Sequence, residues 1–183
     1  MPVFLEASDY ASFLLRLHHF LRGSADHRIG TVRPKGGALV LAYCLMPNHY
    51  HLILIPGTDR LSHQMQMLSI SYTKSFNRKY GRVGPLFQGQ FRAVAVSTPE
   101  QLLSLTAYIH ANPFGAGLEK SVGEWPYSSH PEYVGARDGT LPSRELVLSL
   151  AGGPDGYRSL MAAYDSRGAG YIRPLLLEER DEG

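Results

Sequence analysis

The sequence predicts an α+β fold in which helices pack on one mostly antiparallel sheet. Apolar residues recur at helical spacing in several segments, and two short apolar runs suited to strands follow one another directly. Gly, Pro and Asn residues separate these segments. The resulting order of helix, strand, strand, helix, strand, helix is typical of helices layered on one sheet.

The first helix is expected over residues 9–22. Its apolar residues repeat at helical spacing: Tyr10, Phe13, Leu14, Leu17 and Leu21. Ser8 is suited to cap its start, and Gly23 is suited to end it. The next stretch, residues 24–37, is polar and rich in turn residues, so we expect a loop there.

The strands are expected to begin with a β-hairpin. Residues 38–46, "ALVLAYCLM", form one short apolar run, and residues 49–56, "HYHLILIP", form a second. Pro47 and Asn48 between them favour a tight turn. A third strand is expected at residues 91–96.

The second helix is expected over residues 61–80, where Gly81 offers a stop. Its apolar face is formed by Leu61, Met65, Leu68, Tyr72 and Phe76. Lys74 and Arg78 are four residues apart and therefore share the opposite side of this helix.

A third helix is predicted to begin at Thr98. Thr98 is a suitable N-cap, Pro99 suits the first helical position, and Gln101 completes a capping box. We expect this helix to finish near Asn112, because Pro113 disfavours α geometry in the residue before it. The remaining C-terminal part is expected to be a looser helical region.

Composition bounds the class of protein. The 183 residues suit one domain, or one domain with a short appendage, and 44% of them are hydrophobic, which is enough for a core. Cys44 is the single cysteine, which excludes an intramolecular disulfide framework. No apolar run approaches the roughly 18–20 residues that span a bilayer, and the start lacks the features of a signal peptide. We therefore expect a cytoplasmic protein without a membrane partner.

Positive charge is concentrated in the middle of the chain, although the net charge is only +2. Between residues 60 and 110 the one acid is Glu100, and the basic residues are Arg60, Lys74, Arg78, Lys79, Arg82 and Arg92. Such a segment predicts a surface that contacts phosphates. The alternative is an ordinary solvated basic helix.

Two histidines, His49 and His51, stand one residue apart in the second predicted strand. Residues i and i+2 of a strand point to the same face, so both imidazoles can aim at one point. Imidazole is a ligand for several divalent metals, but two ligands alone are not a site. The alternative is a pair of polar residues on the exposed side of a strand.

Tyr108 and Asn112 are four residues apart on the third predicted helix and lie on one face of it. A tyrosine hydroxyl beside a bound cation can act as a nucleophile if its pKa is lowered or a proton acceptor is present. The amide oxygen of Asn112 is a candidate third metal ligand. The alternative is a structural tyrosine followed by an asparagine that caps the helix C-terminus.

Four motifs together resemble the REP-associated tyrosine transposases, which belong to the single-tyrosine transposases of the HUH superfamily. In order, they are "AYCLMPNHYHLILIP", "GPLFQGQFRAV", "YIHANPFGAGL" and "WPYSS". The resemblance covers about residues 8 to 135, and it depends on all four motifs in this order. It implies a transposase domain over residues 1–135 with a C-terminal helical extension over residues 136–183.

The resemblance also implies a fold and an activity. The fold is ferredoxin-like (RRM-like), with an antiparallel sheet and helices on one face. By matching motif positions, His49, His51 and Asn112 would hold a divalent metal ion, Mg or Mn, and Tyr108 would be the nucleophile. The tyrosine would attack single-stranded or hairpin DNA, giving a 5′-phosphotyrosine link and a free 3′-hydroxyl. DNA binding would fall to Lys74, Arg78, Lys79, Arg82 and Arg92.

Two departures from the family pattern bear on activity. Relatives begin with a further strand before the first helix, whereas this sequence starts essentially at the helix, so the first strand is expected to be missing. Phe114 and Gly115 stand where relatives often carry Val-Arg, which removes one basic residue near Tyr108. The alternative functions are an inactive or domesticated module that binds DNA hairpins, and a metallohydrolase unrelated to DNA.

Overall fold

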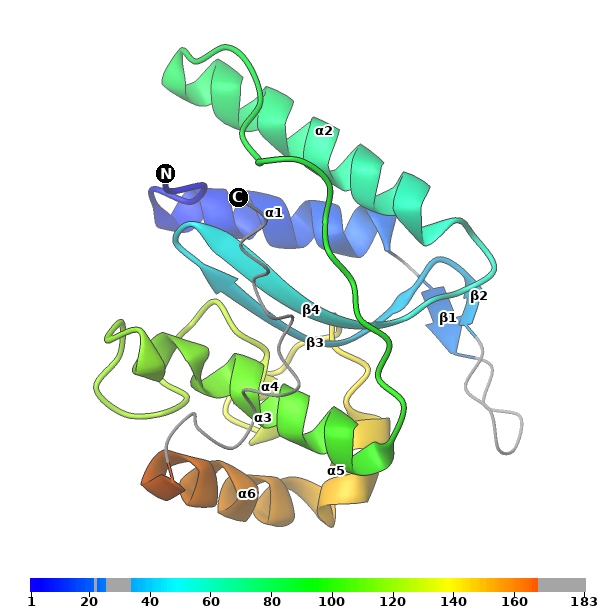
Figure 1. The fold of residues 1–183 in the computed structure, drawn as a ribbon, viewed down its shortest axis with the longest axis vertical. Coiled ribbons are helices and arrows are strands. Elements are labelled where there is room, and N and C mark those ends of the chain that lie inside the picture. Colours follow the sequence, from blue (N-terminus) through cyan, green and yellow to red (C-terminus); the bar gives the residue numbers. More distant parts are fainter. Residues whose placement is uncertain (22, 26–33, 168–183) are drawn as a thin grey trace, which may run out of the picture. The chain divides into compact units, whose positions relative to one another are not determined.

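The computed structural model describes residues 1–21, 23–25 and 34–167 (Figure 1). Contacts divide the chain into two compact units, each described by itself below. The first unit comprises Met1–Leu41, Leu45–Arg92 and Leu141–Ser143, and the second comprises Ala42–Cys44, Ala93–Thr140 and the residues from Arg144 onward. The predicted boundary at residue 135 divides the chain by function rather than by contacts, and it stays a prediction.

The predicted β-hairpin is confirmed. β3 (Leu39–Met46) and β4 (His49–Ile55) form a two-stranded sheet, and Pro47 and Asn48 make the turn between them. Every residue of β3 is buried, as its unbroken apolar sequence predicts.

Two helices form the other layer of the first unit: α1 (Ala7–Phe20) and α2 (Leu61–Tyr80), which lie side by side (Figure 1). Phe13 of α1 joins the layers, because its ring lies 5.1 Å from that of Tyr72 on α2 and 4.8 Å from that of Tyr50 on β4. α2 has the predicted bounds, and Gly81 ends it in the left-handed conformation with φ 62°.

α1 begins two residues before the predicted start, and Ser8 is not its cap. The carboxylate of Asp9 explains the difference, because it accepts the backbone N–H groups of Leu5 and Glu6 at 2.8 and 3.1 Å. These bonds satisfy donors at the helix start that would otherwise lack a partner. The sequence pattern marked the apolar face of α1 but not this acidic cap.

The residues before α1 are part of the core. Val3 and Phe4 are buried, and their N–H groups donate to the carbonyl of Pro47 at 2.7 and 3.1 Å. The hydroxyl of Tyr72 donates to the carbonyl of Val3 at 2.7 Å. This segment therefore ties the hairpin turn to α2.

The predicted loop at residues 24–37 is wrong at its two ends. β1 (Gly23–Ala25) and β2 (Pro34–Gly36) pair antiparallel, with Gly23 opposite Gly36. Backbone pairing of such short, glycine-containing segments carries almost no side-chain signal. Residues 26–33 of the predicted loop lie outside the described residues.

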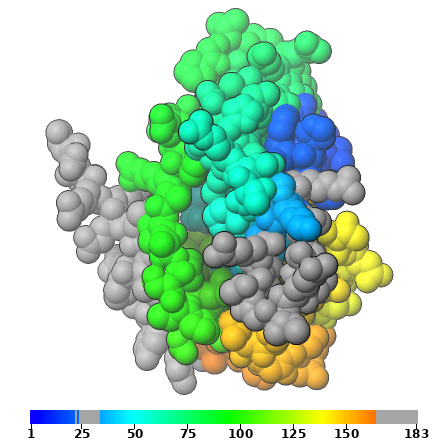
Figure 2. Space-filling model, turned by 90° about the vertical axis from the view of Figure 1, so that its right-hand side faces the viewer, coloured from blue at the N-terminus to red at the C-terminus, as the bar shows by residue number. Residues whose placement is uncertain are grey.

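The predicted third strand at residues 91–96 is also wrong, since this segment forms neither strand nor helix. All of its residues are exposed, and it follows the surface as part of the green segment in Figure 2. Alternating apolar residues stabilise a strand only where a neighbouring edge accepts its backbone. Among the described residues, β3 pairs in a named sheet only with β4, and no sheet includes residues 91–96.

The second unit is built on α3 (Pro99–Gly115), α5 (Glu145–Ala151) and α6 (Gly153–Arg167), which pack against one another (Figure 1), and includes the single turn α4 (His130–Tyr133). The predicted start of α3 is confirmed, because the N–H of Gln101 donates to Thr98 Oγ1 at 3.1 Å. The predicted end near Asn112 is wrong, because the helix runs through buried Pro113. Pro113 is buried while Phe114 and Gly115 are exposed, and the local preference of the residue before proline does not end the helix here.

A buried polar network holds the second unit together. His110 of α3 is fully buried, and its Nδ1 and Nε2 atoms lie 2.6 Å from the hydroxyl of Tyr157 on α6 and 2.7 Å from Ser129 Oγ. Ser129 Oγ also accepts the N–H of Tyr43 at 2.9 Å. Burial keeps His110 and Tyr157 neutral, since it lowers the pKa of His110 and raises the pKa of Tyr157.

The architecture is therefore mixed helix and sheet, which is compatible with the predicted α+β class. In the part of the chain that the structure describes, no helix is both long and apolar enough to cross a membrane.

Candidate functional site

His49 and His51 lie on β4 with their imidazole rings next to each other. Their Nε2 atoms are 3.1 Å apart, and their ring centroids are 4.8 Å apart. Tyr50 between them points the other way, toward Phe13 of α1. The predicted strand alternation is confirmed, because the two histidines share the face of β4 that is turned away from α1.

Asn48 determines which nitrogen of His49 can bind a metal. Its side-chain oxygen lies 2.8 Å from His49 Nδ1. An amide oxygen only accepts hydrogen bonds, so Nδ1 carries the proton and the lone pair of Nε2 faces His51. Such outer partners commonly orient metal-binding histidines. Sequence reasoning used Asn48 only as a turn residue, and its position directly before the first histidine was the available signal.

Both histidine rings are uncharged at neutral pH. Burial lowers the pKa of His51 to about 4, and the neighbouring His49 adds to this effect. Partial burial also lowers the pKa of His49. His49 Nε2 carries a lone pair, and the 3.1 Å contact is a hydrogen bond that His51 Nε2 donates to it, so a shared metal ion would take the place of that proton.

The separation of the two Nε2 atoms fits two ligands of one divalent cation. Nitrogens bound about 2.1 Å from a cation at tetrahedral or octahedral angles stand about 3.0–3.4 Å apart. The described residues contain no group of three or more His, Cys, Asp and Glu side chains suited to a metal ion. A complete site would need a donor of another kind, such as the amide oxygen predicted at Asn112 or water.

Tyr108 and Asn112 lie on α3 in the second unit, and both are half-buried. Burial raises the pKa of Tyr108, so its hydroxyl is protonated at neutral pH. Asn112 is not the helix cap, because α3 continues to Gly115 and the N–H of Ala116 donates to the carbonyl of Asn112. The histidine pair belongs to the first unit, so its combination with these two residues in one site stays a prediction.

Two of the four sequence motifs meet inside the second unit, where His110 of "YIHAN" bonds to Ser129 of "WPYSS". No family model, curated protein or solved structure matches this chain. The resemblance to the REP-associated tyrosine transposases therefore depends on the order and spacing of the four motifs.

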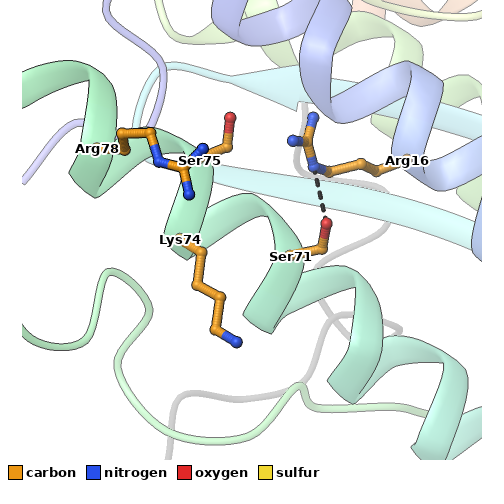
Figure 3. Close-up of a pocket in the computed structure, with 5 residues that line it drawn as sticks. All are labelled: Arg16, Ser71, Lys74, Ser75 and Arg78. Atoms are coloured by element: carbon orange, nitrogen blue, oxygen red, sulfur yellow. Dashed lines mark hydrogen bonds between the residues drawn. The ribbon is translucent and has the colours of Figure 1, made fainter.

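The five predicted DNA-binding residues have different surroundings. Lys74 and Arg78 are exposed on α2 and line a pocket together with Arg16 of α1 (Figure 3). The guanidinium of Arg82 lies 5.7 Å from the ring centroid of Phe76, so it packs against the end of α2. Arg92 is exposed in the segment that follows.

Lys79 is exposed, but its ammonium group is paired with two acids. Its Nζ atom lies 2.5 Å from Glu6 Oε1 and 2.6 Å from Asp9 Oδ1, and both bonds raise the pKa of Lys79. Desolvation favours a higher pKa for Asp9, but bonds from Lys79, the Leu5 N–H and the Tyr80 hydroxyl outweigh it and lower that pKa. This ion pair fastens the start of α1 to the end of α2.

Proposed function

We propose that the protein is a metal-dependent single-strand DNA endonuclease and strand transferase of the REP-associated tyrosine transposase type, built on a ferredoxin-like domain. The observation that carries the proposal is the 3.1 Å separation of His49 Nε2 and His51 Nε2 on one face of β4. In the absence of metal the same separation is that of a hydrogen bond between two neutral rings, and a bound cation would replace the bonding proton. The four motifs supply the remaining roles.

His49, His51 and Asn112 would hold Mg or Mn, which would polarise the scissile phosphate and withdraw charge from a non-bridging oxygen. Tyr108 would attack the phosphorus, forming a bond from its hydroxyl oxygen while the bond to the 3′-oxygen breaks. The products are a 5′-phosphotyrosine and a free 3′-hydroxyl, and reversal on another end completes strand transfer. Because burial raises the pKa of Tyr108, its proton must leave as the attack proceeds.

The test is covalent capture of hairpin-forming single-stranded DNA. The protein is incubated with labelled oligonucleotide and Mn or Mg, and denaturing gels are examined for a protein–DNA adduct. We expect an adduct with the wild type and none with Tyr108→Phe. Tyr127→Phe is the matched control, because it removes the same hydroxyl from another half-buried tyrosine of the second unit.

The metal role is tested separately by titrating Mn into the protein without DNA. His49→Ala and His51→Ala should each weaken Mn binding by at least the roughly 10- to 100-fold that loss of a ligand's outer partner costs, and should abolish adduct formation. An adduct that survives in Tyr108→Phe contradicts the assignment of the nucleophile. Hairpin binding without any adduct in the wild type would favour the alternative, an inactive hairpin-binding module.

A further inference from the structure

A pocket of about 230 Å³ opens between α1 and α2 in the first unit (Figure 3). Arg16 reaches into it from α1. The other lining residues come from α2: Ser71, Lys74, Ser75 and Arg78. Their spacing of three, four and seven residues places all four on one stripe of the helix.

The pocket has positive charge that nothing described in the protein balances. Three of its five lining residues are cationic, and no described carboxylate forms an ion pair with them. Glu6 and Asp9, the acids at the end of the same helical layer, are bound to Lys79. Lys74 and Arg78, at positions i and i+4, also repel one another. An anion would therefore relieve an unfavourable arrangement.

Arg16 is held in position before any ligand arrives. Its Nε donates to Ser71 Oγ at 3.1 Å, which is the dashed line in Figure 3. Its Nη1 donates to the carbonyl of Ser12 at 2.9 Å. These bonds fix the guanidinium plane, so little side-chain freedom remains to be lost on binding.

We propose that this pocket binds phosphate groups of a nucleic acid strand, with Arg16, Lys74 and Arg78 as its charged contacts. Guanidinium, ammonium and hydroxyl donors arranged around a cavity suit a tetrahedral group whose oxygens point in several directions. A backbone phosphate carries one charge, so three cations accommodate successive phosphates of a strand. The choice of a strand over free phosphate rests on the proposed function.

The experiment measures binding of a fluorescent hairpin oligonucleotide by anisotropy, between about 50 and 300 mM salt. Arg16→Gln and Arg78→Gln should each weaken binding about fivefold and reduce the slope of log affinity against log salt by about one. Arg60→Gln is the matched control. It removes one exposed arginine at the other end of α2, about 27 Å from Arg78 at 1.5 Å per residue, and should leave the slope unchanged.

A second arm titrates inorganic phosphate into the wild type and follows the amide NMR signals of residues 71–78. Pocket variants that bind the oligonucleotide like Arg60→Gln overturn the proposal, even where the Tyr108 adduct still forms and the proposed function stands. If phosphate shifts the pocket signals but no strand binds, the nucleic acid assignment and the proposed function both fail. If neither ligand binds, the pocket is not a phosphate site.

Discussion

Ser129→Ala tests the buried network of the second unit most directly. Ser129 Oγ accepts the N–H of Tyr43 at 2.9 Å and lies 2.7 Å from His110 Nε2. Ser129 Oγ donates its own proton to the carbonyl of Tyr43 at 3.2 Å, so it accepts the proton on His110 Nε2, and His110 Nδ1 in turn accepts from the hydroxyl of Tyr157. The alanine variant therefore leaves two buried donors without an acceptor.

Each orphaned buried donor costs about 1–3 kcal/mol, so we expect Ser129→Ala to lose about 3 kcal/mol of unfolding free energy. For a chain of this length that corresponds to a fall in Tm of about 6–12 °C. Urea titration followed by circular dichroism measures the free energy, and a thermal scan measures Tm.

Ser128→Ala is the matched control, because Ser128 is equally buried but its side-chain bonds are longer, at 3.2 and 3.3 Å. Ser128→Ala orphans one buried donor, the N–H of His130, and removes only a long bond, so its loss should be about 1 kcal/mol. Equal losses in the two variants would refute the reasoning, since volume alone would then explain both.

Three further predictions concern stability. Asp9→Asn should cost about 2 kcal/mol in urea titration, because it removes the charged acceptor of Lys79 and Tyr80, and a neutral effect would exclude a clamping role. Lowering the pH from 7 to 5 should reduce the free energy of unfolding, because below pH 6.5 His110 takes up a proton only in the unfolded chain. The loss should reach up to about 1.4 kcal/mol per pH unit, and a free energy of unfolding that does not change with pH would contradict this. Val94→Thr should change stability by less than about 0.5 kcal/mol, because Val94 is 51% exposed, whereas a paired strand would respond more strongly.

The elements that could be predicted are those whose own side chains determine them. α2 has its predicted bounds because its apolar stripe lies within the segment and a left-handed Gly81 directly follows it. Residues 91–96 have an alternating pattern, but a strand also needs a partner edge, which no local pattern supplies. The local preference of the residue before Pro113 did not predict the end of α3, because the helix continues through this buried proline to Gly115.

In the candidate site, too, some features follow from the local sequence and others depend on tertiary packing. The shared face of His49 and His51 follows from strand period alone, and the structure confirms it. Arg16 could not be singled out, because it lies 55 residues from Ser71 in the sequence and meets α2 only through packing of the two helices. Lys79 looked equivalent to Arg78 in the sequence, and only its pairing with Glu6 and Asp9 distinguishes it.

The two faces of β4 have different surroundings in the first unit. Tyr50 contacts the helical layer, which contains the Arg16 pocket, while His49 and His51 emerge on the opposite side of the same strand. A nucleic acid strand that engages both the pocket and the histidines must therefore reach from the helical layer to the opposite side of β4.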